Sequence, residues 1–242
     1  MALLPEDARA VSVAAEPRRA GRELLLEGVF RPAATVFVPL LARAGVPPPA
    51  VVLVNAATGL LAAVVLARGD LVAAALLLQA KTLLDNLDGQ LARVTGRVTL
   101  LGRYLDTLAD LVVNAAIFAA LGHVTGQWPL AVAAFLALTV VLAADFNATE
   151  LYRGAHDIPT AAPLRSGGAL EGALGRAYGL LLGPLDRAVR GLARRRFREG
   201  ASYDASTVTI LANLGLTTQL AVLGVCLVLA APALYCWLCL GC

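Results

Sequence analysis

The sequence predicts an all-α fold: a polytopic membrane bundle of five or six transmembrane helices with an N-terminal interfacial amphipathic helix. Of its 242 residues, 59% are hydrophobic and 15% are charged, whereas soluble domains are about half apolar and about a quarter charged. The apolar residues gather in runs of about twenty, the length that a helix needs to cross the hydrocarbon core. Only 5% of residues are aromatic. The apolar mass is therefore Ala, Leu and Val, which suits closely packed membrane helices.

The N-terminal region has no apolar run long enough to cross a membrane. Residues 1–22 are mixed and charged, and we expect them to form a cytoplasmic tail. Residues 23–45 carry charges around an apolar face and are interrupted at Pro32 and Pro39. This pattern favours a helix lying in the membrane interface over a full span. The Pro-rich segment Val46–Ala50 then ends this helix and begins the next.

Residues 46–241 form the predicted transmembrane domain. Its four well-defined spans cover about 49–67, 71–94, 100–122 and 128–148. The last apolar stretch, 206–241, is too long for one span. We expect Pro232 to divide it into a fifth helix and a short sixth.

A polar insert rich in Gly, Pro and Arg occupies about residues 149–205. Within it, an amphipathic surface helix is expected at about 172–197, ending in the basic cluster Arg194–Arg198. This cluster has two interpretations. It is a binding site for anionic lipid or substrate phosphate, or it is a solvated cytoplasmic flank of a membrane span.

The arginines indicate how the chain is oriented in the membrane. The short loops at 68–70 and 123–127 carry one arginine between them, and the other polar regions carry nearly all the rest. Loops rich in Arg stay in the cytoplasm, so the tail, the 93–103 turn and the insert are expected there. The net charge of +3 flanks apolar runs and forms no separate basic module, so we expect no nucleic-acid partner.

Four aspartates lie where the second span ends and the third begins: Asp85, Asp88, Asp106 and Asp110. Residues three or four apart share a helix face, and a short turn makes the two helices antiparallel neighbours, so the four carboxylates are expected to converge. Each costs about 2.5–3.5 kcal/mol deep in a membrane helix. Oxygen ligands of this kind suit Mg²⁺ or Mn²⁺. The sequence therefore predicts a metal site that opens to the cytoplasm.

Basic and small residues accompany the aspartates. Arg93, together with hard cations, would attract a pyrophosphate. Gly89, Ala92 and Gly102 leave room either for a flat nucleobase or for close helix packing. Both interpretations of the small residues stay open at this point.

The complete pattern, Asp-x2-Asp-Gly-x2-Ala-Arg-x8-Gly-x3-Asp-x3-Asp, resembles the signature of the CDP-alcohol phosphotransferases at all eight specified positions. These membrane enzymes make phospholipids and related phosphodiesters. The resemblance implies that Asp85, Asp88 and Asp106 ligate two divalent ions. It also implies that Asp110 contributes a ligand and acts as general base on the acceptor hydroxyl. The residues expected around CDP are Gly89, Ala92, Arg93 and Gly102.

The resemblance also implies substrates and surroundings. The donor would be a CDP-linked lipid such as CDP-diacylglycerol, the acceptor a small alcohol and the leaving group CMP. A homodimer in the bacterial inner membrane is expected, with the active site facing the cytoplasm. Candidate acceptor-binding residues are Arg103, Arg153 and Arg165. Family members often carry Pro-Asn near the start of the first span; here Asn55 either replaces that polar group or packs in the core.

Two other functions are compatible with acidic residues in a membrane. A cation-coupled transporter or channel would place the acidic residues near the bilayer midplane and would repeat them in the second half of the chain. Residues 128–241 contain no matching pair of acidic groups. A catalytically idle membrane scaffold would have to keep four costly carboxylates without metal.

Overall fold

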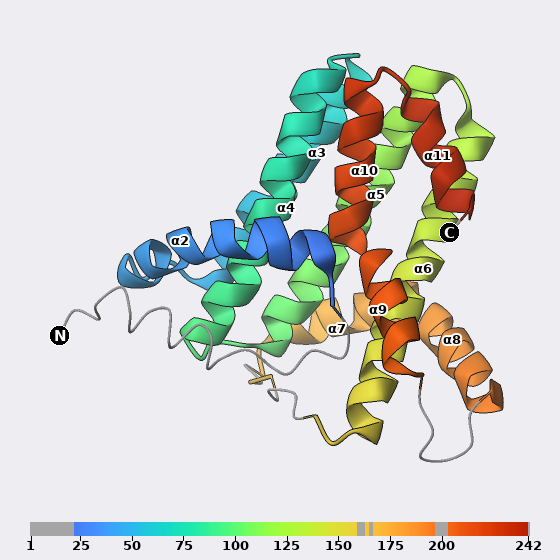
Figure 1. The fold of residues 1–242 in the computed structure, drawn as a ribbon. Coiled ribbons are helices and arrows are strands. Elements are labelled where there is room, and N and C mark those ends of the chain that lie inside the picture. The colour runs from blue at the N-terminus through green and yellow to red at the C-terminus, as the bar shows by residue number, and fades with distance from the viewer. Residues whose placement is uncertain (1–21, 159–162, 165–166, 197–202, 242) are drawn as a thin grey trace.

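The computed structural model describes residues 22–158, 163–164, 167–196 and 203–241. Throughout these ranges the regular structure is helical, and extended pairing is limited to one isolated bridge between Thr99 and Leu164. The predicted all-α fold is confirmed (Figure 1). The predicted tail falls outside the described residues except for Arg22.

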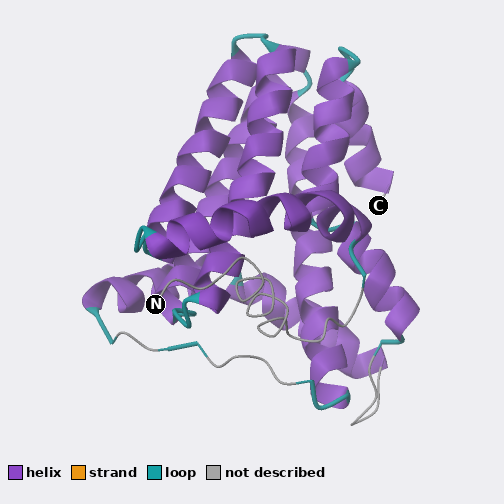
Figure 2. Ribbon diagram, turned by 60° about the vertical axis from the view of Figure 1, so that its left-hand side comes forward, coloured by secondary structure: helices purple, strands orange, loops and turns teal. Residues whose placement is uncertain are grey.

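The first labelled element of the described residues is a π-helical turn, Leu26–Phe30, that continues into α2, Arg31–Arg43. Pro32 lies in the first turn of α2, where a missing N–H costs little. Pro39 lies inside α2, so neither proline interrupts the helix, contrary to the prediction. Ala34 and Val38 are buried against α4, whereas Phe37 and Leu40 are exposed. The helix crosses the bundle instead of running along it (Figures 1 and 2). It therefore presents one apolar face to the protein and another to its surroundings.

The first four predicted spans are helices. They are α3, Pro48–Ala67; α4, Leu71–Val94; α5, Leu100–Thr125; and α6, Trp128–Ala155. Gly126 has a left-handed φ of 69°, the usual way for a helix such as α5 to end. α6 continues seven residues past the predicted limit at 148. Hydropathy marks only the part of a helix that lies in lipid, and a helix can extend beyond the membrane.

The C-terminal stretch forms three helices: α9, Ala205–Asn213; α10, Leu216–Val228; and α11, Pro232–Gly241. Pro232 divides the stretch as predicted, and a second break at Leu214–Gly215 was not predicted. Within the part of the chain that the structure describes, four stretches are long and apolar enough to cross a membrane: Pro48–Ala67, Leu100–Thr125, Trp128–Ala155 and Ala205–Val228. They identify the chain as a membrane protein. α4 packs between α3 and α10 and is less apolar because it carries polar site residues.

The insert contains two helices, α7 at Ala169–Leu181 and α8 at Gly183–Arg196, where one helix was predicted. Both lie at the end of the bundle where α4 meets α5, opposite the short loops at 68–70 and 126–127 (Figures 1 and 2). α7 packs on α5 and α8 packs on α6. The end of the predicted basic cluster, from residue 197, lies outside the described residues.

Close packing of α3 against α4 and α5 depends on Gly59. A Cβ at this position would meet Val113 Cγ1 at 2.4 Å and Lys81 Cδ at 3.2 Å. Gly59→Ala should therefore lower the thermal midpoint of the detergent-solubilised protein, because overpacking a core costs about 1–3 kcal/mol. Gly154→Ala is the control, since nothing lies within 4 Å of its Cβ. Equal midpoints for the two variants would contradict the prediction.

Candidate active site

A short turn between α4 and α5 sets the geometry of the site. Gly96 takes a left-handed φ of 66° in this turn, a conformation that glycine adopts without strain. Thr99 then caps α5, its Oγ1 accepting a hydrogen bond from the backbone N–H of Gly102 at 3.0 Å. The result is an antiparallel pair of helices, as predicted, but α4 and α5 pack closely on α3 and not on each other, and they meet through their site side chains.

Three of the four aspartates lie together between these helices. Asp85, Asp88 and Asp106 each place a carboxylate oxygen within 4.8 Å of the others. Among the described residues, Asp88 Oδ2 and Asp106 Oδ1 are buried and have no hydrogen-bond partner. Burying such oxygens without a partner is costly, and like charges at this distance repel one another. The three residues therefore fit a divalent cation, and their oxygens suit Mg²⁺ or Mn²⁺.

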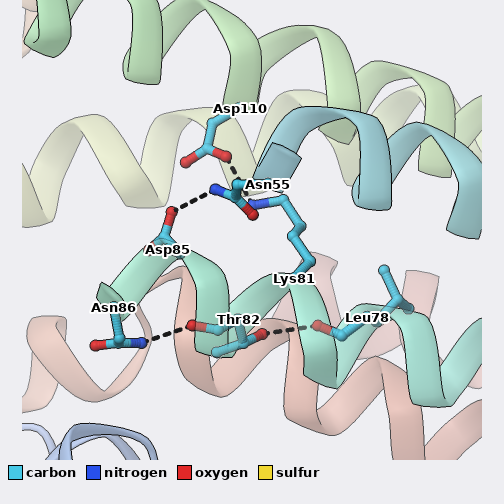
Figure 3. A network of polar contacts seen from close by, with 7 residues as sticks. All are labelled: Asn55, Leu78, Lys81, Thr82, Asp85, Asn86 and Asp110. Atoms are coloured by element: carbon cyan, nitrogen blue, oxygen red, sulfur yellow. Dashed lines mark hydrogen bonds and ion pairs between the residues drawn. The ribbon is translucent and has the colours of Figure 1, made fainter. Parts of the chain in front are cut away.

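Asp110 has a different partner. Its Oδ1 accepts a hydrogen bond from Lys81 Nζ at 2.7 Å, forming an ion pair between α5 and α4 (Figure 3). The Lys81 side chain is fully buried, whereas that of Asp110 is 22% exposed. Sequence reasoning missed the role of Lys81. The available signal was that this residue, the single lysine of the chain, lies in a membrane span one helical turn before Asp85.

Asn55 lies beside the aspartates. It is 2% exposed, and its Nδ2 donates a hydrogen bond to Asp85 Oδ1 at 3.2 Å (Figure 3). Thr82 and Asn86, drawn in the same view, instead bond to carbonyl oxygens of their own helix. Asn55 was predicted either to replace the polar group of the family or to pack in the core. The hydrogen bond to Asp85 agrees better with the polar role. This contact orients a carboxylate.

A cavity of about 440 Å³ opens beside two of the three carboxylates, Asp88 and Asp106. All four residues predicted to surround CDP line this cavity: Gly89, Ala92, Arg93 and Gly102. Asp88 and Asp106 line it from the helices, and Pro48, Pro49 and Val52 line it from the start of α3. The small residues thus border open space, which favours room for a ligand over helix packing as their role.

A second cavity, of about 680 Å³, also borders Asp106. It extends along Asp110 to the two insert helices. The two cavities share Arg103, Asp106, Phe146 and Glu150.

The predicted acceptor-binding arginines are distributed unevenly over the two cavities. Arg103 lines both of them. Arg153 lines the first, where its Nη1 lies 3.9 Å from Glu150 Oε1. Arg165 lies outside the described residues. The acceptor role of all three stays a prediction.

Comparisons with known proteins identify the family of the chain. The sequence profile of the CDP-alcohol phosphatidyltransferases matches residues 46–168, about half of the chain. A "Bifunctional IPC transferase and DIPP synthase" of Aquifex aeolicus (strain VF5) is 37% identical over 82 residues, which cover 34% of this chain and 19% of that protein. This chain thus aligns with less than a fifth of that relative. The matched segment 46–168 contains the whole aspartate motif with its glycines and arginine, and the chain belongs to the CDP-alcohol phosphatidyltransferase family.

Proposed function

We propose that the protein transfers a phospho-alcohol group, of the phosphatidyl type, from a CDP-alcohol such as CDP-diacylglycerol to an acceptor alcohol and releases CMP. This reaction serves phospholipid biosynthesis. The observation that carries the proposal is the cluster of Asp85, Asp88 and Asp106, whose buried oxygens lack partners next to a cavity lined by small residues and Arg93. A cluster of this kind is costly unless cations and a phosphate-bearing substrate occupy it.

Asp85, Asp88 and Asp106 would hold the divalent ions, Mg²⁺ or Mn²⁺, with Asp110 near enough to contribute a ligand. Two bound ions would stabilise the negative charge that develops on the phosphates. Asn55 would fix the orientation of Asp85 through its 3.2 Å hydrogen bond. Arg93 would contact the pyrophosphate, while Gly89, Ala92 and Gly102 would leave space for the nucleotide.

The acceptor hydroxyl oxygen would attack the phosphorus that carries the donor alcohol. A new oxygen–phosphorus bond forms there as the bond from that phosphorus to the CMP oxygen breaks. Asp110 would take the proton of the hydroxyl. Its carboxylate lines the second cavity and is held through Oδ1 by Lys81, which leaves Oδ2 to accept the proton.

We further propose that this end of the bundle faces the cytoplasm of the bacterial inner membrane. The α4–α5 turn and the insert, which carry many of the arginines, lie at this end, whereas the opposite loops carry Arg68. Arg-rich segments remain cytoplasmic. Residues 23–45 would lie in the interface with their second apolar face toward lipid. A homodimer is proposed from the family resemblance.

Metal removal tests the proposal. Purified protein in lipid nanodiscs, given CDP-diacylglycerol and a panel of acceptors (glycerol 3-phosphate, inositol phosphate, serine and glycerol), should release CMP when Mg²⁺ or Mn²⁺ is present. Chelation with EDTA should reduce the rate to background, and excess Mg²⁺ should restore it, because the substrate phosphates and the aspartates would otherwise repel each other. CMP release that persists in EDTA would contradict the metal role. The absence of CMP with every CDP-alcohol and acceptor would contradict the reaction.

A further inference from the structure

We infer that the insert helices α7 and α8 complete the acceptor site, and that the acceptor carries a phosphomonoester group bound by Arg103 and Arg187. This inference rests in part on the proposed function, because it assigns the second substrate of that reaction. It concerns a part of the chain that lies beyond the family-matched segment 46–168.

The second cavity has the position that an acceptor site requires. It borders Asp106 of the carboxylate cluster and Asp110, the proposed base. Gly89, Ala92 and Arg93 line the first cavity and not the second. A donor bound through these residues would leave the second cavity to the second substrate. An alcohol there would reach both the base and the reacting phosphorus.

The insert is attached to the bundle by specific polar contacts. Asn147 of α6 is 2% exposed; its Nδ2 donates to Asp186 Oδ1 at 3.4 Å, and its Oδ1 accepts from Arg190 Nε at 2.8 Å. The Tyr178 hydroxyl donates to Asp186 Oδ2 at 2.8 Å. The rings of Tyr104 and Tyr178 lie 5.5 Å apart. These contacts hold α7 and α8 as a wall of the cavity.

Three arginines line the second cavity: Arg103, Arg187 and Arg190. Its carboxylates already have partners or a proposed use: Asp110 pairs with Lys81, Asp186 accepts from Tyr178 and Asn147, Glu150 lies near Arg153, and Asp106 belongs to the metal cluster.

Arg190 is used in anchoring the insert, where its Nε donates to Asn147 Oδ1. Arg103 of α5 and Arg187 of α8 remain. Both line the cavity, and neither forms an ion pair with any residue that the structure describes. A guanidinium fork binds phosphate oxygens in pairs, so an anionic acceptor matches these two side chains.

Tyr178 gives separate support for the position of Arg103. Burial and the hydrogen bond to Asp186 raise the pKa of this phenol to about 12, while Arg190 and Arg103 act on its pKa in the opposite direction. Arg103, which belongs to α5, therefore lies within electrostatic reach of the insert. Arg187 approaches the same cavity from α8.

The test measures acceptor kinetics with the full chain in phosphatidylcholine nanodiscs. Wild-type protein should use glycerol 3-phosphate or inositol phosphate at a lower KM than glycerol or inositol. Arg187→Gln should raise the KM of the phosphorylated acceptor about tenfold or more, the usual effect of losing a charged hydrogen bond, and should leave the KM of CDP-diacylglycerol within about twofold. Arg176→Gln is the matched control, because Arg176 is exposed on α7 and lines neither cavity. It should change neither constant.

Binding without turnover separates this inference from the proposed function. In the absence of donor, glycerol 3-phosphate should raise the thermal midpoint of the wild-type protein and of Arg176→Gln, but not that of Arg187→Gln. This shift would support the anion site even if no CMP were released. Equal shifts in all three proteins would overturn the inference, and so would equal use of phosphorylated and plain alcohols. A KM effect that appears only in phosphatidylglycerol nanodiscs would assign Arg187 to lipid headgroups and would also overturn it.

Discussion

Replacing Asp88 with asparagine is expected to reduce CMP release by about a thousandfold or more, the scale on which charge stabilisation in a transition state is lost. Asp88 is 7% exposed, and its Oδ2 is one of the two oxygens of the carboxylate cluster without a partner among the described residues. An amide offers one neutral oxygen and cannot balance a divalent cation. The measurement is the initial rate of CMP formation at saturating Mg²⁺.

The same variant should behave differently in a stability assay. In EDTA its thermal midpoint should equal or exceed that of the wild type, because one of three repelling carboxylates is gone. Added Mg²⁺ should stabilise the wild type, by about 2.7 kcal/mol at a hundred times Kd, and should not stabilise the variant. Asp70→Asn is the control: Asp70 caps α4 at the far end of the bundle, and asparagine also caps helices. Equal losses of activity in the two variants would contradict the assignment.

Replacing Lys81 with methionine should lower both stability and rate. Removing one partner of a buried ion pair costs about 3–5 kcal/mol, because the other charge is left without compensation. Asp110 would also lose the donor that orients its carboxylate, so CMP release should fall by about a hundredfold or more. The measurements are the thermal midpoint and kcat of the variant in nanodiscs.

A double variant separates these two effects. Lys81→Met with Asp110→Asn removes both charges and should recover most of the lost stability, while its rate should remain as low as that of Asp110→Asn alone. If the double variant were less stable than Lys81→Met, the 2.7 Å pair would not be the source of the stability change.

The spans and the aspartate cluster were predictable because their signals are local. α4 begins and ends at the predicted residues, 71 and 94, since an apolar run bounded by Asp70 and the Thr95–Gly96 turn defines it. Spacing of three and four residues placed the aspartates on facing stripes, and three of them do meet. The division of the insert into two helices was also predictable, because Gly183-Pro184 is a turn signal inside the single helix that was predicted.

The partners of Asp110 and Asp85 were not predictable in the same way. Lys81 lies 29 positions before Asp110, and Asn55 lies 30 before Asp85. Which of several polar side chains meet across a bundle depends on how the helices rotate and how closely they approach, as the tight contact at Gly59 illustrates. The second cavity is likewise lined partly by the insert helices, whose place depends on long-range contacts such as those of Asn147 with Asp186 and Arg190.

The buried ammonium of Lys81 changes the electrostatic balance of the whole site. Four carboxylates and one ammonium leave three negative charges, and a single divalent ion reduces that excess to one. A second ion would make an enclosed site positive, which is unfavourable until the anionic pyrophosphate arrives. If the site holds two ions, as proposed above, the lysine would make its completion depend on the donor: the first ion would bind the resting protein and the second would enter together with the nucleotide.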